Sequence, residues 1–175
     1  MTELVNDLLS LSRLDNEKDK DEIEDLNLTE ELYKTCEVYK KYIEGKGLTL
    51  KSDIDKNVTF TCHPGKIKQL INILLDNAIK YNKENGEVKI ILKKSDYTFN
   101  LIVKDTGIGI KKEEIPNVFD RFFRSDSSRS TTGTGLGLAI AYGIVKSHFG
   151  TIKVNSEVGK GTEFIVTFPY DINNK

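Results

Sequence analysis

The stretch "GTGLGLAIA" (Gly133–Ala141) holds three glycines within five residues and then becomes apolar. Glycines so close together are costly, because each adds backbone freedom that folding must remove. One reason to place them before a helix is that an anion must approach the backbone, since a helix N-terminus offers free N–H groups and a favourable dipole. The stretch therefore suggests a phosphate-binding loop.

The common glycine motifs of nucleotide-binding proteins do not fit this stretch. A P-loop needs Gly-Lys followed by Ser or Thr after an earlier glycine, and the sequence has no such run. A dinucleotide fingerprint needs a third glycine where this sequence has Leu138 or Ile140, and the preceding "RSDSSRSTT" is no strand. Taken alone, the stretch is equally compatible with a phosphate loop and with a flexible turn.

Composition limits the function classes. The 175 residues suffice for one domain, and 38% hydrophobic with 30% charged residues is typical of globular proteins. A net charge of −1 argues against nucleic acid as a partner, and no apolar run is long enough to cross a membrane. Cys36 and Cys62 lack metal-ligand spacing, so we expect both to be packing residues in a reducing compartment.

Hydrophobic periodicity predicts interleaved helices and strands. The chain opens with an amphipathic helix whose stripe includes Leu4, Leu8 and Leu11, followed by a charged linker. We expect a short strand from Leu26, then a second helix capped by Thr29, and a third helix opened by Pro64. The further expected elements are strands at 48–54, 58–62, 87–94, 98–105, 151–157 and 162–168, a short helix within 111–124 and a helix from 135. Without a regular βαβ rhythm, this order favours an α+β fold, a two-layer sandwich with a mixed, mostly antiparallel sheet packed on helices.

Two further glycine pairs and one helix face support a nucleotide site. "DTGIGI" (Asp105–Ile110) follows a predicted strand and begins with a carboxylate, and "GKGT" (Gly159–Thr162) forms a predicted hairpin turn. On the helix from 63 to 83, Asn77, Lys80 and Tyr81 are three and four residues apart, so their side chains converge. Each feature alone has a simpler structural explanation, and their combination favours a phosphate-bearing ligand.

In this order, "LLDNAIKY", "DTGIGI", "VFDRFFR", "GTGLGLAIAYGIVKSHFGTIKV" and "GKGTEF" resemble the N, G1, F, G2 and G3 boxes of bacterial sensor histidine kinases. The resemblance runs from Leu26 to Tyr170 and implies the ATP-binding catalytic domain, whose Bergerat (GHKL) sandwich is shared with gyrase, MutL and heat-shock chaperone ATPases. It further implies that residues 1–16 end a helix of the dimerisation and phosphoacceptor hairpin, that 17–25 form a linker, and that 26–172 form the catalytic domain.

The resemblance assigns roles to individual residues. Asp105 would accept a hydrogen bond from the adenine amine and repel the guanine carbonyl, and Gly107 and Gly109 would let the chain pass close to the base and sugar. Asn77 would ligate Mg²⁺, while Lys80 with Tyr81, and Arg124 at the γ-phosphate, would meet the phosphates. Further residues expected around the nucleotide are Ile110, Thr132, Gly133, Thr134, Gly135, Leu136, Gly137, Leu138 and Thr162. Phe119, Phe122 and Phe123 would pack beneath a polar lid, Ser125–Thr132, which we expect to be mobile without nucleotide.

The sequence departs from the family pattern in two places. Ile73 stands four residues before Asn77, where related ATPases place a general base, which argues against an ATP-hydrolysing chaperone or topoisomerase. The chain's two histidines, His63 and His148, both lack the family's phosphoacceptor context. We expect His63 near a helix cap and His148 as a cation at a helix C-terminus. The sequence thus resembles a catalytic fragment that does not autophosphorylate alone.

The resemblance implies a protein-histidine kinase in two-component signal transduction. Its expected partners are ATP or ADP with Mg²⁺, its own dimerisation hairpin in a homodimer, and a cognate response regulator. The expected location is a cytoplasmic domain of a membrane-anchored protein. Two alternatives stay open at this point, which are a stand-alone serine kinase of the anti-sigma-factor type and a degenerate domain that binds nucleotide only to regulate a partner.

Overall fold

The computed structural model of the chain describes residues 22–125 and 133–170. The predicted helix at 1–16, most of the predicted linker, Thr132 and all of the predicted lid except Ser125 lie outside these ranges. Within the described residues, no helix combines the length and the apolar composition that crossing a membrane would need.

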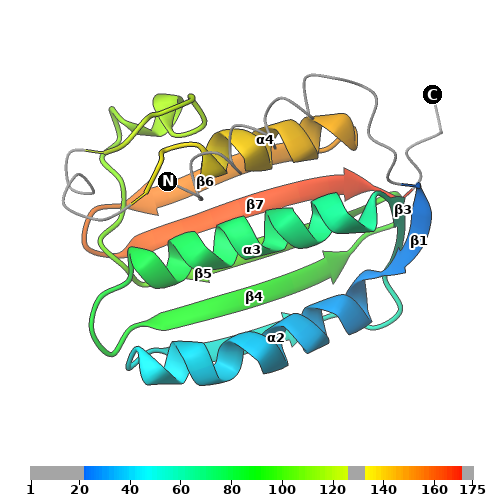
Figure 1. Ribbon diagram of the computed structural model, residues 1–175, viewed down its shortest axis with the longest axis horizontal. Helices are drawn as coiled ribbons and strands as arrows, with labels where there is room; N and C mark the ends of the chain where they lie inside the picture. The colour runs from blue at the N-terminus through cyan, green and yellow to red at the C-terminus, as the bar shows by residue number, and fades with distance from the viewer. Residues whose placement is uncertain (1–21, 126–132, 171–175) are drawn as a thin grey trace.

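A five-stranded sheet forms one layer of the domain (Figure 1). Its spatial order is β2 (Thr49–Ile54), β4 (Glu87–Lys94), β5 (Thr98–Asp105), β7 (Gly161–Pro169) and β6 (Thr151–Glu157). The β2–β4 pair is parallel and the other three pairs are antiparallel. Two short strands, β1 (Glu24–Asn27) and β3 (Thr59–Cys62), form a separate antiparallel ribbon. The predicted mixed, mostly antiparallel sheet is confirmed.

In the part of the chain that the structure describes, the helices α2 (Leu28–Gly45), α3 (Pro64–Lys80) and α4 (Gly137–Ser147) form the second layer and cover one face of the sheet (Figure 1). Among these helices, α3 lies between the other two. The sheet residues that face them alternate along each strand, as in Val88, Ile90 and Leu92 of β4, which are all buried. The predicted core stripe of α3 is also buried, namely Ile67, Ile71, Leu74 and Ala78. The two-layer sandwich expected from the sequence is therefore the observed fold.

The start of α2 differs from the prediction. Asn27 caps the helix by accepting a hydrogen bond from the Glu30 N–H, so Thr29 is not the N-cap. The Thr29 hydroxyl instead donates to the Asp55 carbonyl oxygen at 2.8 Å and accepts from the Val58 N–H at 3.1 Å. A threonine that satisfies its hydroxyl in a neighbouring loop cannot also cap its own helix.

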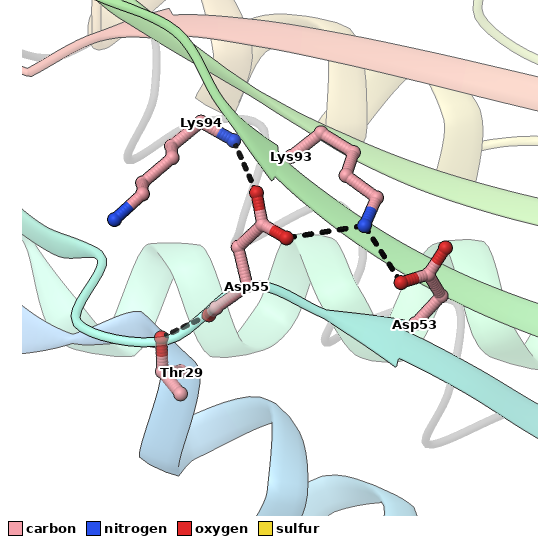
Figure 2. A network of polar contacts seen from close by, with 5 residues as sticks. All are labelled: Thr29, Asp53, Asp55, Lys93 and Lys94. Atoms are coloured by element: carbon pink, nitrogen blue, oxygen red, sulfur yellow. Dashed lines mark hydrogen bonds and ion pairs between the residues drawn. The ribbon is translucent and has the colours of Figure 1, made fainter.

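This contact joins α2 to a polar network at the ends of β2 and β4 (Figure 2). The Asp55 carboxylate accepts from the Lys94 N–H at 3.0 Å and from Lys93 Nζ at 3.1 Å, and Lys93 Nζ also contacts Asp53 at 2.6 Å. Backbone hydrogen bonding at Lys94 is the main reason why the pKa of Asp55 is lowered. The network fixes the edge strand β2 to the sheet and to the helix layer.

Three further boundaries correct the sequence prediction. β1 begins at Glu24, inside the segment expected to be linker, because its backbone pairs with β3. The short helix expected within 111–124 is a single 3-10 turn, Ile115–Asn117, because Pro116 cannot donate the hydrogen bond that a longer helix needs there. Helix α4 begins at Gly137 rather than Gly135, whose φ of +73° is left-handed.

Candidate functional site

A cleft of about 290 Å³ opens where the C-terminal end of α3 meets the loop after β5, the N-terminal end of α4 and the start of β7. Thirteen residues predicted from the sequence line it: Asn77, Lys80, Tyr81, Asp105, Gly109, Ile110, Arg124, Gly133, Thr134, Gly135, Gly137, Leu138 and Thr162. Gly107 and Leu136 do not line it, and the Leu136 side chain is fully buried in the core. Segments far apart in sequence thus converge on one site.

Asp105 lies at the end of β5 and is 5% exposed. One carboxylate oxygen, Oδ1, accepts hydrogen bonds from the Gly107 N–H at 2.7 Å and the Thr162 N–H at 3.2 Å. Burial raises the pKa of Asp105 to about 6, although both hydrogen bonds oppose the shift. Because two N–H groups hold Oδ1, the other oxygen is the one that can accept from a ligand in the cleft.

Gly107 explains how the loop after β5 stays close to α3. A Cβ at this position would overlap the Tyr81 carbonyl and would lie 2.8 Å from Asp105 Oδ1. The adjoining Ile108 N–H donates to that same Tyr81 carbonyl at 3.0 Å. Gly107 itself does not contact the cleft. Because it has no side chain, the loop can lie close to Tyr81, and the next residues, Ile108 and Gly109, line the cleft.

The glycine-rich stretch forms the opposite wall. Gly135 is left-handed, and a Cβ there would lie 2.9 Å from backbone atoms of Phe122 and Phe123. Its carbonyl accepts from the Phe122 N–H at 3.0 Å, which fastens the stretch to the preceding segment. Helix α4 then starts without a side-chain cap. Its first N–H groups are consequently suited to hold an anion.

Polar and cationic groups line the same end of the cleft. The Asn77 Nδ2 donates to the Ile73 carbonyl at 2.8 Å, which leaves the side-chain oxygen as the acceptor available to a ligand. Lys80 Nζ lies 5.1 Å from the centre of the Tyr81 ring and close to Gly133. Arg124 and the α4 N-terminus add positive charge at this end, which Asp76 also lines.

Several lining residues were not predicted from the sequence. The apolar ones are Ile73, Ile108, Val118, Phe123 and Phe164, and the polar one is Asp76, while Ser125 was expected as the first residue of the lid. Asp76 directly precedes Asn77, so its place beside the metal-ligand candidate could have been noticed. Of the three phenylalanines expected beneath the lid, Phe119 stacks against Tyr142 and Phe164, but Phe122 is 60% exposed and Phe123 lines the cleft. Phe122 also has a positive φ. Because residues 126–132 lie outside the described ranges, the expected packing of these rings beneath the lid stays a prediction.

The two histidines lie together, away from the cleft. His63 precedes Pro64 as the N-cap residue of α3, as expected, at the opposite end of that helix from Lys80. His148 is fully buried at the end of α4, where its Nδ1 contacts the Ile144 carbonyl at 2.8 Å and its Nε2 accepts from the His63 N–H at 3.2 Å. Burial lowers the pKa of His148 to about 4. The expected cation at this helix end is therefore wrong, because loss of solvation outweighs the helix dipole.

Residues 62–172 match the profile of the family described as "Histidine kinase-, DNA gyrase B-, and HSP90-like ATPase". The chain belongs to this family. The sensor protein kinase WalK of Staphylococcus aureus is 37% identical to this ATPase domain over 179 residues, which span 98% of the chain. The chain covers 42% of that WalK sequence and 29% of the WalK from strain Newman, so it spans less than half of the curated relatives that it matches.

Solved structures of histidine kinases share the fold. Full-length ShkA in complex with AMPPNP superposes with a TM-score of 0.83 at 25% identity, over 95% of this chain and 35% of that one. The nucleotide-free catalytic domain of ThkA superposes with a TM-score of 0.78 at 26% identity, over 88% of this chain and 99% of that one. The chain therefore holds a histidine kinase ATPase domain, as the order of its sequence boxes indicated.

Proposed function

We propose that this domain binds Mg-ATP in the cleft and transfers the γ-phosphoryl group to a histidine carried by a dimerisation hairpin. The observation that carries the proposal is the polarity of the cleft. A buried carboxylate lies at one end, and two cations with an uncapped helix N-terminus lie at the other. A ligand with a neutral hydrogen-bonding base and a polyanionic tail matches both ends.

Asp105 reads the base in this proposal. Its second carboxylate oxygen accepts a hydrogen bond from the exocyclic amine of adenine, while guanine would present a carbonyl oxygen to the same atom. The apolar side chains of Ile108, Ile110 and Phe164 line the surrounding wall and exclude water from the base. The N–H of Thr162, at the start of β7, donates to the Asp105 carboxylate and so helps to fix it in position for the base.

The opposite end binds the phosphates. Lys80 and Arg124 supply positive charge, and the segment from Gly133 to Leu138 supplies backbone N–H groups. Asn77 offers a hard oxygen ligand of the kind that Mg²⁺ accepts alongside waters and phosphate oxygens. Among the described residues no group of three acidic, histidine or cysteine side chains could hold a metal by itself, which fits an ion brought with the nucleotide. Bound Mg²⁺ would neutralise charge on the phosphates.

The acceptor must come from outside the cleft. Both histidines of the sequence lie at the end of the helix layer remote from the phosphate-binding groups, and His148 is buried. A rise of 1.5 Å per residue places Pro64 about 24 Å from Lys80 along α3. Ile73 lines the cleft next to Asn77, so its side chain supplies no general base to activate water. This arrangement supports phosphoryl transfer to a supplied imidazole over rapid hydrolysis.

We infer a wider setting from the same proposal. The intact kinase would be a homodimer anchored in a membrane, with this domain on the cytoplasmic side. The phosphohistidine on its hairpin would then pass the phosphoryl group to an aspartate of a response regulator. The name of the relative, sensor protein kinase WalK, supports the signalling part of this setting.

Incubation with γ-labelled ATP tests the proposal directly. The chain is incubated alone, with a supplied histidine-bearing dimerisation hairpin, and with that hairpin after its acceptor histidine is changed to glutamine. We expect acid-labile label on the unaltered hairpin and none on the chain itself. Label on the chain that disappears on changing His63 or His148, or acid-stable label on any serine, would overturn the proposal.

A further inference from the structure

We propose that Asp76, held in place by Tyr39, makes the cleft select metal-loaded ATP over free ATP. This inference rests on the proposed function and concerns a residue to which the mechanism above gives no part. Asp76 is a specificity-determining residue in this proposal, and Tyr39 is its positioning residue.

The position of Asp76 places a negative charge beside the phosphate-binding end. Two carboxylates of the described residues line the cleft, Asp105 at the base end and Asp76 on α3. Asp76 directly precedes Asn77 and lies four residues, about one helical turn, before Lys80. Asp76 is exposed where it lines the cleft. An anion at this place opposes the binding of a bare triphosphate.

Tyr39 fixes this carboxylate from the neighbouring helix. Its ring, on α2, packs against the hydrophobic core, and its hydroxyl donates to Asp76 Oδ1 at 3.1 Å. The same hydroxyl lies 3.4 Å from Asn72 Oδ1. Burial, followed by the charge of Asp76, holds the pKa of Tyr39 well above its usual range, so the hydroxyl keeps its proton and acts as a donor. The carboxylate is thereby held at the rim of the cleft.

A metal ion changes the interaction between the Asp76 carboxylate and the bound ATP from repulsive to attractive. Free ATP carries only negative charge near Asp76, whereas Mg²⁺ reduces that charge and keeps several bound waters. Those waters are hydrogen-bond donors, and an adjacent carboxylate is a suitable acceptor for them. With Asn77 as the direct oxygen ligand, Asp76 would act on the waters of the ion from its place in the cleft lining. It therefore weakens binding of free ATP and strengthens binding of Mg-ATP.

Calorimetry of ATP binding to the full chain, in excess Mg²⁺ and in EDTA, tests this proposal. The measured quantity is the ratio of the two dissociation constants, metal-free over metal-loaded. Asp76→Asn keeps the size of the side chain and removes the charge, and should lower this ratio about threefold to tenfold, as expected for one partly screened unit charge. Tyr39→Phe keeps the packed ring and should lower it by a smaller factor. Asp96→Asn, an exposed change in the turn between β4 and β5, is the matched control and should leave it unchanged.

A structural role for Asp76 would give a different result. Loss of packing would weaken the binding of ATP and of Mg-ATP by the same factor and leave the ratio as in the wild type. This result overturns the proposal, and so does a variant in which neither dissociation constant changes. An unchanged ratio in Tyr39→Phe removes Tyr39 from it. If the wild-type chain does not bind Mg-ATP, the proposed function fails. If it binds and the Asp76→Asn ratio is unchanged, only the present inference fails.

Discussion

At the scale of one residue, the buried carboxylate of Asp105 lowers the stability of the fold, although the proposed function needs it to bind adenine. Its pKa is raised to about 6, so the folded state holds a proton that the unfolded chain releases near pH 4. From about pH 4 to pH 6, stability is therefore lost as the pH rises, and it stays lower above that window. Asp105→Asn keeps an oxygen for the Gly107 and Thr162 N–H groups. It should be more stable than wild type by about 1–3 kcal/mol near pH 7.5.

Urea unfolding at several pH values checks this prediction. The difference in free energy of unfolding between Asp105→Asn and wild type should fall toward zero as the pH drops to about 4. Asp96→Asn, with its exposed side chain, serves as the control. A variant less stable than wild type at pH 7.5 would show that the buried charge is stabilising after all.

The same substitution should damage recognition. Asparagine has one side-chain oxygen, and the two backbone N–H groups already occupy the equivalent atom, so its amide N–H₂ would face the adenine amine. We expect ATP affinity to fall by at least tenfold, with the wild-type preference for ATP over GTP strongly reduced. Competition binding with both nucleotides measures this. Equal ATP affinity of variant and wild type would place the base elsewhere.

At the scale of elements, His148 joins the end of α4 to the start of α3. Its fully buried ring forms hydrogen bonds with the Ile144 carbonyl and the His63 N–H. Its pKa is lowered to about 4 in the folded state. Below about pH 6.5 the unfolded chain therefore binds a proton at this ring that the folded state excludes. This contribution is complete above pH 6.5 and is lost as the pH falls toward 4. His148→Ala should cost about 2–4 kcal/mol near pH 7.5, and the deficit should shrink at pH 5.

Denaturant midpoints at the two pH values measure the effect, and His63→Ala is the control. That variant keeps the backbone N–H that bonds to His148, so it should retain most of the acid sensitivity of the wild type. A His148→Ala deficit that does not depend on pH would contradict the assignment of a neutral, buried ring.

The elements themselves were largely predictable, and so were the ends of several strands, whereas helix starts were predicted less well. Alternation in "EVKIILKK" and "TFNLIVKD" predicted β4 and β5 to the residue, because one face of each strand is buried. The cap of α2 was mispredicted because Thr29 bonds to Asp55 and Val58, which lie more than twenty residues away. The protonation state of His148 was likewise inaccessible, because only the tertiary fold buries it.

Across the whole molecule, the cleft is built from α3, the β5 loop, α4 and β7, so a bound nucleotide holds most of the domain together. We expect Mg-ATP at one hundred times its dissociation constant to add about 2.7 kcal/mol to the free energy of unfolding. Thermal unfolding with increasing Mg-ATP measures this as one cooperative transition that moves upward. A transition that splits in two, with only one part responding, would contradict a cleft shared by the whole domain.

The composition of the site shows where sequence reasoning ends at this scale. The ordered boxes located thirteen lining residues, because glycines, a carboxylate and an Asn-Lys pair signal their chemistry directly. Phe164 and Val118 could not be told from core residues, since an apolar wall residue follows the same alternation as its buried neighbours. Asp76 gains its position from Tyr39, thirty-seven residues earlier, which no local pattern records.

The place of β7 in the sheet has a consequence for synthesis on the ribosome. β7 lies between β5 and β6 although it is the last strand in the sequence, and its residues pair with β5 partners about sixty to seventy positions earlier. Until residue 169 has been translated, a nascent chain leaves one edge of β5 unpaired and Asp105 without the Thr162 N–H. Such an open apolar edge invites association between chains. Premature termination shortly before Gly161 should therefore yield insoluble product that binds no nucleotide, however complete its helices are.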